Sequence, residues 1–406
     1  MDHLELPQFL GLLIAILGTA KLFGALAQWI GQPAVLGEMC AGVILGASIF
    51  GIVDPTTEVL HLLAEVGVII LLFAIGLETD LRKLLAVGGA ATAVALVGVA
   101  LPFALGFGTC LALGLSNLTA VVAGATLTAT SVGITARVLS DLNRLQEPES
   151  QIVLGAAVID DVLGLVILAV VAGITRGEAV SASGIALTTG MAFGFIGATL
   201  LVGRLIVPPL VSRLSKIDLP GTPTILAILL TFTLSWLANY LGSATIIGAF
   251  AAGLLIRESP QAHEIERGVA SLGHFFVPIF FVVVGAAVDL RVFNPFHGAN
   301  HHTLLVGGAL ILCAVVGKFL AGYAPYWFRG DKRVIGVGMI PRGEVGLIFA
   351  QMGLSTGVFD ASMFSAVALM VMVTTFMAPP LLKALLPPQV GADNEMDAIE
   401  ELVTEA

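Results

Sequence analysis

The sequence contains the stretch Gly155-Ala-Ala-Val-Ile-Asp-Asp-Val-Leu-Gly164, in which two adjacent carboxylates interrupt an apolar run. The run covers about residues 151–176, which is long enough for a helix to cross a bilayer. One charge at the centre of such a helix costs about 2.5–3.5 kcal/mol on insertion scales, and two neighbouring charges also repel each other. Because neighbours on a helix point about 100° apart, one carboxylate can face a cavity while the other turns to another helix. The pattern indicates a functional site; a buried charge pair that locks helices together is the alternative.

The rest of the chain has the composition of a membrane protein. Of its 406 residues, 57% are apolar and only 11% are charged, whereas soluble domains carry about 25% charged residues. The first apolar run lacks a positively charged start and a small-residue cleavage pattern, so we expect a permanent span. The predicted fold is an all-α polytopic membrane protein with thirteen transmembrane helices, at 9–30, 35–52, 59–77, 86–113, 118–139, 151–176, 183–207, 222–241, 244–257, 270–289, 303–328, 335–354 and 363–386.

Charge and cysteine usage exclude several classes of function. The net charge is −10, but much of the acid lies in residues 387–406, which we expect to form an acidic cytoplasmic tail. No basic patch supports nucleic-acid binding. Cys40, Cys110 and Cys313 have neither zinc nor disulfide spacing, and we expect them to be small buried residues.

The basic residues predict the orientation, because Lys and Arg are enriched in cytoplasmic loops. With the N-terminus outside and the C-terminus in the cytoplasm, the outer loops hold only Arg176 and Arg291. Losing one helix from the count would invert part of this pattern, so the bias also supports thirteen helices. The residues assigned to the inner side are Arg82, Lys83, Arg137, Arg144, Arg204, Arg213, Lys216, Arg257, Arg267, Arg329, Lys332, Arg333 and Lys383.

Two short matches predict an internal repeat. Residues 76–82, Gly-Leu-Glu-Thr-Asp-Leu-Arg, match residues 285–291, Gly-Ala-Ala-Val-Asp-Leu-Arg. Upstream, Gly37 and Gly42 match Gly248 and Gly253 at nearly the same offset. The match leads from the second predicted helix to the ninth, and an odd shift makes the two copies face opposite ways. Inverted repeats are typical of secondary transporters with a site near the midplane; chance similarity between glycine-rich helices is the alternative.

Three basic residues, Lys21, Lys318 and Arg342, fall inside the predicted spans. A buried ammonium needs a carboxylate partner or it loses its proton, so Asp160 or Asp161 is the natural partner of Lys318. A lysine that releases its proton when another cation takes its partner is suited to carrying protons. A permanent structural ion pair is the alternative.

Two predicted helices contain residues that interrupt helical structure. Ala125-Thr-Leu-Thr-Ala-Thr-Ser-Val-Gly133 holds four hydroxyls and a glycine, and unwound backbone at membrane depth must be buried in protein or line a cavity. Thr130 and Ser131, with nearby carbonyls, offer the oxygen ligands that a hard cation such as sodium prefers, by analogy with calcium. Ordinary packing by small residues is the alternative.

The second interruption is Met339-Ile-Pro-Arg-Gly-Glu-Val-Gly346, in which Pro341 and Gly343 flank Arg342. We predict that this segment is the inverted counterpart of the first, so that two interrupted helices meet at the centre of the molecule. Arg342 and Glu344 are assigned a structural or electrostatic role.

Four segments resemble the cation/proton antiporter superfamily, and most closely its bacterial NapA-type sodium/proton antiporters. The similarity covers about residues 7–386, and the segments are Phe73-Ala-Ile-Gly-Leu-Glu-Thr-Asp-Leu, Ala129-Thr-Ser-Val-Gly-Ile-Thr-Ala-Arg-Val-Leu, Gly155-Ala-Ala-Val-Ile-Asp-Asp-Val-Leu-Gly-Leu and Pro341-Arg-Gly-Glu-Val-Gly-Leu-Ile. The resemblance implies a NapA/NhaA-like antiporter fold with two broken, crossed helices, in which a dimerisation and a core subdomain interleave over residues 1–386. We place the repeats at about 33–176 and 244–386. It further implies a homodimer, and we expect the chain in the bacterial inner membrane.

The resemblance also implies roles for the central residues. Asp161 is the main carrier of ions and protons, and Asp160 pairs with Lys318 when no sodium is bound. Asp160 and Asp161 are therefore the expected sodium ligands. Charge-neutral relatives tend to have Asn at the position of Asp160, so the Asp here implies electrogenic exchange.

The expected function is a secondary active transporter, and not an enzyme, that exchanges sodium or lithium for protons by alternating access. We expect no cofactor besides the transported ions. A potassium/proton antiporter of the same superfamily is the main alternative, because the ligands are common to these cations. A cation channel would need a continuous pore, and an aspartyl protease would need two facing aspartates on different helices.

Overall fold

The computed structural model describes residues 5–175, 182–214, 221–288, 290 and 300–386, and this part of the chain is helical with no strands. Within it, nine helices are long and apolar enough to cross a membrane, and four further apolar helices are shorter. The predicted tail at 387–406 lies outside the described residues. In chain order the helices are α1 (Leu6–Trp29), α2 (Ala34–Leu45), α3 (Glu58–Glu78), α4 (Leu81–Ala86), α5 (Gly88–Ala112), α6 (Asn117–Thr126), α7 (Val132–Asp141), α8 (Pro148–Thr175), α9 (Ala182–Leu214), α10 (Thr222–Tyr240), α11 (Thr245–Arg257), α12 (Ala262–Ala286), α13 (Asn300–Ala321), α14 (Lys332–Gly338), α15 (Glu344–Ser355) and α16 (Ala361–Leu385).

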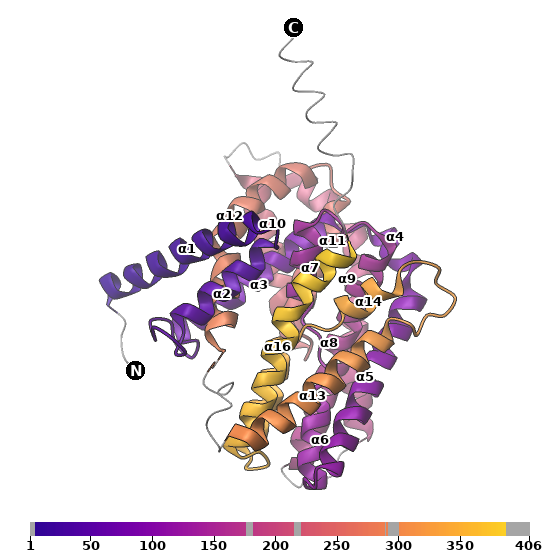
Figure 1. Ribbon diagram of the computed structural model, residues 1–406. Coiled ribbons are helices and arrows are strands. Elements are labelled where there is room, and N and C mark those ends of the chain that lie inside the picture. Colours follow the sequence, from indigo (N-terminus) through magenta and orange to yellow (C-terminus); the bar gives the residue numbers. More distant parts are fainter. Residues whose placement is uncertain (1–4, 176–181, 215–220, 289, 291–299, 387–406) are drawn as a thin grey trace.

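The helices form two bundles that alternate along the chain. In the first bundle, α1, α2, α3, α10, α11 and α12 pack on one another; in the second, α5, α6, α8, α13, α15 and α16 do so. Figure 1 shows α1 and α2 of the first bundle at the upper left and α5, α6 and α13 of the second at the lower right. The short helix α4 connects α3 to α5, and α9 contacts both α11 and α8. Each bundle therefore takes helices from both halves of the sequence.

Glycines set the packing of the first bundle. A Cβ atom on Gly42 of α2 would lie 2.1 Å from the carbonyl oxygen of Val282 in α12, and one on Gly253 of α11 would lie 2.3 Å from that of Phe73 in α3. Only glycine permits such close backbone approach. Gly42 and Gly253 are matched positions of the predicted repeat, so matched residues make matched contacts.

The same correspondence holds at the other pair of matched glycines. A Cβ on Gly37 would lie 2.1 Å from the carbonyl oxygen of Phe23 in α1, and one on Gly248 would lie 2.3 Å from that of Leu234 in α10. The helices concerned, α2 and α11, have 12 and 13 residues. At 1.5 Å per residue they are shorter than the roughly 30 Å thickness of the apolar part of a bilayer. They are buried against longer neighbours.

The prediction of one helix over 35–52 is wrong at its C-terminal end. The helix stops at Leu45, and the amides of Ile52 and Val53 both donate to the Leu45 carbonyl, so the chain folds back on itself. The Ser48 hydroxyl donates to the carbonyl of Val288 at 2.6 Å and anchors this turn. Apolar residues continue through the turn, which is why hydropathy alone extended the helix.

Two of the predicted helices are broken, as their sequences indicated. Residues 127–131 separate α6 from α7, and residues 339–343 separate α14 from α15. The hydroxyls of Thr126 and Thr128 donate to the carbonyls of Ala123 and Ala125, a side-chain alternative to helical bonding. In the second break, Pro341 has no amide hydrogen to donate.

Other predicted boundaries need smaller corrections. The helix predicted at 86–113 starts later, at Gly88 of α5. Ala86 is instead the last residue of the separate short helix α4, which Asp80 caps. The segment 183–207 continues through two prolines to Leu214. The segment 270–289 begins earlier, at Ala262, and the segment 303–328 ends earlier, at Ala321.

Candidate ion-binding site

The two aspartates of α8 are buried in the second bundle. Asp160 is 1% exposed and Asp161 is 8% exposed. The elements that pack against α8 include α5, α6, α7 and α14. Burying a carboxylate is costly unless other groups compensate its charge, so the neighbours of these two residues decide what the site can hold.

Lys318 of α13 forms an ion pair with Asp160. The Lys318 Nζ lies 2.5 Å from the Asp160 Oδ2, and both side chains are fully buried. Gly98 of α5 leaves room for the lysine, because a Cβ atom there would lie 3.3 Å from Nζ. The residue pattern left both aspartates open as partners, and the structure brings Lys318 to Asp160.

The first helix break also reaches Asp160. The Thr130 hydroxyl donates to Asp160 Oδ2 at 2.7 Å, so this oxygen accepts from both a lysine and a threonine. The other oxygen, Oδ1, is buried and has no hydrogen-bond partner among the described residues. A buried acceptor left unpaired costs about 1–3 kcal/mol. Asp160 therefore keeps one oxygen with capacity for a cation, a proton or a water molecule.

The two breaks contact each other directly. The amide of Ser131 donates to the carbonyl of Pro341 at 2.8 Å, and the Thr135 hydroxyl donates to the carbonyl of Gly338 at 2.7 Å. A side chain at position 343 would force Ser131 to shift, because a Cβ there would lie 2.7 Å from the Ser131 Oγ and 2.9 Å from its Cβ. Part of the unwound backbone thus bonds to the opposite break, as irregular backbone buried in protein at membrane depth requires.

Arg342 fills the centre of this crossing. Its side chain is fully buried, and its Nη1 donates to the carbonyl of Ala129 in the other break. A cation is favoured there because carbonyls at the C-terminal end of a helix carry partial negative charge. Nε and Nη2 have no hydrogen-bond partner in the described part of the chain. Arg342 and Asp160 also interact electrostatically.

The formal charges of the site balance. Asp160 and Asp161 supply two negative charges, and Lys318 and Arg342 supply two positive ones. Asp160 and Asp161 both attract Lys318. A further cation entering the fully charged site would leave an uncompensated positive charge in a medium of low dielectric, which favours release of a proton.

The remaining predicted residues are placed less directly. Ser131 is buried and joins the crossing through its amide. Glu344 begins α15, and its side chain lies outside the described part of the structure. Among the described residues, no group of three or more His, Cys, Asp and Glu side chains gathers to hold a metal. A cation that bound at Asp160 and Asp161 would therefore need hydroxyl or carbonyl oxygens as its further ligands.

Sequence reasoning missed two groups at the site. The Thr375 hydroxyl of α16 donates to the carbonyl of Arg342, which ties the second break to the last helix. Gly98, which accommodates Lys318, lies in a helix to which no role was assigned. The pair Thr374-Thr375 within an apolar run was a weak signal for the first; nothing distinguished Gly98 from other helical glycines.

The sequence and the fold are both similar to those of known proteins. The sequence matches the model of the family described as "Sodium/hydrogen exchanger, transmembrane" over residues 12–387. It is 40% identical to the high-affinity Na(+)/H(+) antiporter NhaS3 of Synechocystis sp., over 92% of this chain and 88% of that protein. It is 36% identical to the Na(+)/H(+)-K(+) antiporter GerN of Bacillus cereus, over 94% and 96%. The solved structure of the sodium proton antiporter MjNhaP1 from Methanocaldococcus jannaschii has the same fold, with a TM-score of 0.65 at 18% identity over 93% of this chain and 96% of that one.

Proposed function

The chain belongs to the transmembrane sodium/hydrogen exchanger family, and we propose that this multi-pass membrane protein exchanges sodium, or lithium, for protons. The observation that carries the proposal is the buried pair of Asp160 and Lys318 beside Asp161, where two broken helices cross. Buried ionisable groups are expensive in a membrane protein, and they mark ion pathways more often than packing.

In the proposed cycle Asp161 alternates between a proton and a sodium ion. Without sodium, Asp161 holds a proton and Lys318 stays charged beside Asp160. Sodium binds the two carboxylates together with oxygens of the first break, among them that of Thr130, and it competes with Lys318 for Asp160. Asp161 then releases its proton, and so does Lys318, because its carboxylate partner is taken and a positive charge has arrived.

This cycle is electrogenic. Two protons leave the site for each sodium ion that enters, so one net charge crosses the membrane per turnover. A membrane potential contributes about 2.3 kcal/mol per charge per 100 mV, which is enough to drive sodium uphill. The proposal depends on an aspartate at position 160, since an asparagine there would leave Lys318 without its charged partner.

Alternating access requires the site to open to one side at a time. We infer that the second bundle moves against the first, with α4 and α9 as the connections that absorb the movement. The backbone contacts at Gly42 and Gly253 support a rigid first bundle. The matched contacts of these glycines support the inverted repeats at about 33–176 and 244–386, and a count of thirteen spans follows if α6–α7 and α14–α15 each count as one.

Potassium is the second candidate for the exchanged cation. A specific observation favours it: the relative GerN is named as an antiporter of both sodium and potassium. Carboxylate and hydroxyl oxygens bind either ion, so the choice depends on the size of the site. We keep sodium as the proposed substrate because the relatives NhaS3 and GerN both carry sodium in their names.

Assembly and orientation complete the proposal. We propose a homodimer in the bacterial inner membrane, with the N-terminus outside and the C-terminus in the cytoplasm. The bias of Lys and Arg between the two sides supports this orientation. No cofactor besides the transported ions is part of the proposal.

The test is proton flux driven by an ion gradient in liposomes that contain the purified protein. Sodium, lithium and potassium are imposed in turn, with and without a membrane potential. We expect sodium and lithium to drive proton movement and the potential to change its rate. If only potassium drives flux, potassium replaces sodium in the proposal. Proton movement that does not depend on any cation gradient would refute exchange.

A further inference from the structure

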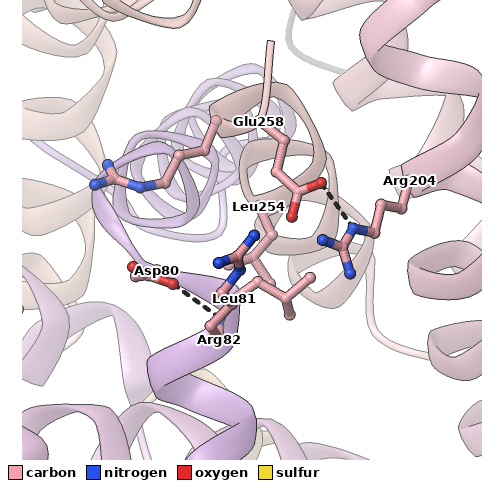
Figure 2. A pocket seen from close by; sticks show the side chains of 7 residues that line it. Asp80, Leu81, Arg82, Arg204, Leu254 and Glu258 are labelled. Carbon is pink, nitrogen blue, oxygen red and sulfur yellow. Dashed lines mark hydrogen bonds and ion pairs between the residues drawn. The ribbon is translucent and has the colours of Figure 1, made fainter.

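A polar cavity lies away from the ion-binding site, at the end of α3 where the chain passes into α4. Its volume is about 430 Å³, and three arginines from three helices line it together with Asp80 and Glu258. Figure 2 shows Arg82 of α4 and Arg204 of α9 extending toward the same space from different helices. Glu258, at the end of α11, reaches Arg204 there. Small-molecule sites usually have volumes of about 300–1,000 Å³.

The charges that line the cavity leave an excess of positive charge. The Arg204 Nε pairs with Glu258 Oε2 at 2.9 Å, and the Arg257 Nη1 donates to the carbonyl of Leu77 at 2.6 Å. The Asp80 carboxylate accepts from the amides of Arg82 and Lys83 at the start of α4. The guanidinium of Arg82 has no carboxylate or carbonyl partner among the described residues. An anion that enters the cavity therefore meets the free guanidinium of Arg82. It also meets those of Arg204 and Arg257, in which only some of the N–H groups are bonded.

The surface next to the cavity identifies the source of that anion. Leu201 and Leu205, which flank Arg204 on α9, are 74% and 77% exposed, and Leu85 on α4 is 65% exposed. The part of α9 that holds these leucines is long and apolar enough to cross a membrane, so we take them to face the acyl chains of lipids. A cavity with guanidinium groups beside an acyl-chain surface combines the two requirements of a phospholipid, whereas a free phosphate ion would need only the first.

We propose that this cavity binds the phosphate headgroup of an anionic phospholipid, with Arg82 and Arg204 as its main ligands. Guanidinium groups bind phosphate oxygens through paired hydrogen bonds, and basic pockets between membrane helices bind acidic headgroups. The bound lipid links α4, the connection between the two bundles, to α9 and α11 of its surroundings.

The test measures lipid binding without transport, so its outcome is independent of the proposed exchange. The melting temperature of the full-length protein in detergent is followed against concentration of short-chain phosphatidylglycerol, phosphatidylcholine or inorganic phosphate, since ligands of the folded state raise it by mass action. We expect phosphatidylglycerol alone to stabilise the protein. Arg82→Gln should weaken its apparent affinity about fivefold, the effect of one basic residue near a lipid surface.

Three further variants give the direction of the effect and a control. Glu258→Gln removes a negative charge and frees Arg204, so it should strengthen binding, whereas Arg204→Gln should weaken it. Arg267→Gln removes a charge that is also exposed, on α12 and outside the cavity, and should change nothing. Equal stabilisation by inorganic phosphate would overturn the lipid assignment. Absence of stabilisation by phosphatidylglycerol, or the same affinity in Arg82→Gln, Glu258→Gln and the parent, would overturn the site itself.

Discussion

The two bundles use paired helices in opposite ways. In the first, α2 meets α12 and α11 meets α3 through glycines, where backbone packs against backbone. In the second, the paired elements are broken. The breaks contain Thr130 and Arg342, and Thr130 bonds to Asp160, which forms an ion pair with Lys318. The first bundle therefore has backbone contacts that tolerate no added atom, while the second gathers several charged side chains at one site.

This difference indicates that the first bundle is a rigid scaffold and that the second bundle changes its state of protonation and ion binding. Close backbone packing has a single arrangement, because adding or removing even one methylene group disturbs it. The site around Asp160 instead holds several groups whose protons and partners can exchange. Perturbing each bundle should consequently give different signatures: loss of folding in the first and changed ion response in the second.

The largest loss of stability should come from the glycine contacts. Gly42→Ala forces a Cβ to within 2.1 Å of the Val282 carbonyl oxygen, and backbone cannot yield as a flexible side chain does. We expect a cost above the roughly 1–3 kcal/mol of ordinary overpacking, seen as a large drop in melting temperature or failure to fold. The control is Gly108→Ala on α5, where nothing lies within 4 Å; equal melting temperatures for the two variants would contradict the scaffold interpretation.

The next effect concerns Lys318. Lys318→Gln leaves Asp160 buried without its charged partner, which typically costs about 3–5 kcal/mol. Exchange should be absent or carried by Asp161 alone, and so nearer to electroneutral. Liposomes under an imposed potential test this point directly, with the exposed Lys21→Gln as the control. The double variant with Asp160→Asn should recover part of the stability; a Lys318→Gln protein that responds to voltage like the parent would make the lysine purely structural.

A smaller effect is expected at Thr130, the residue that joins the first break to Asp160. Thr130→Val keeps the shape but removes a hydrogen bond to a charged acceptor, worth about 1.5–3 kcal/mol. The sodium concentration for half-maximal flux should also rise. Thr130→Ser retains the hydroxyl and should stay close to the parent. If valine and serine behave alike in both melting and flux, the hydroxyl is not a ligand of the site.

The smallest effect lies outside the site, at the cap of α14. The Arg333 side chain and amide donate to Asp331, and these bonds lower the pKa of the Asp331 carboxyl below its ordinary value. A lowered pKa means that the carboxylate stabilises the fold at neutral pH and that this contribution is lost as the pH falls through the folded-state pKa. Asp331→Ala should cost about 1 kcal/mol at neutral pH.

The pH dependence of melting checks the assignment of this cap. The difference between parent and Asp331→Ala should shrink on acidification, while Asp331→Asn, which keeps a capping side chain, should lie between them at neutral pH. A difference that grows in acid would contradict the sign derived from the lowered pKa.

Much of this architecture could be predicted because charge and helix breakers are rare in apolar sequence. Asp160, Lys318 and the segment around Pro341 stand out for that reason, and the structure brings them to one place. The partner of Lys318 could not be chosen from the residue pattern, since it depends on how α8 is rotated toward α13.

Hydroxyls inside apolar helices were harder to interpret. The side chain of Thr374 donates to the carbonyl of Met370 in its own helix, whereas that of its neighbour Thr375 reaches Arg342. Both patterns are common for threonine, and sequence alone does not separate them. The early end of α2 was missed for a similar reason: Ile49 and Phe50 are apolar, but they belong to an exposed turn.

The central claim is that Asp161 carries the exchanged ion and proton. The most direct measurement is sodium-driven proton flux in liposomes that contain Asp161→Asn, compared with the parent and with Asp160→Asn. Asparagine keeps the size of the side chain but cannot take up and release a proton at neutral pH, so we expect a folded Asp161→Asn protein without flux. Asp160→Asn should keep exchange with a reduced response to voltage. Robust sodium-dependent flux from the Asp161→Asn protein would contradict the account.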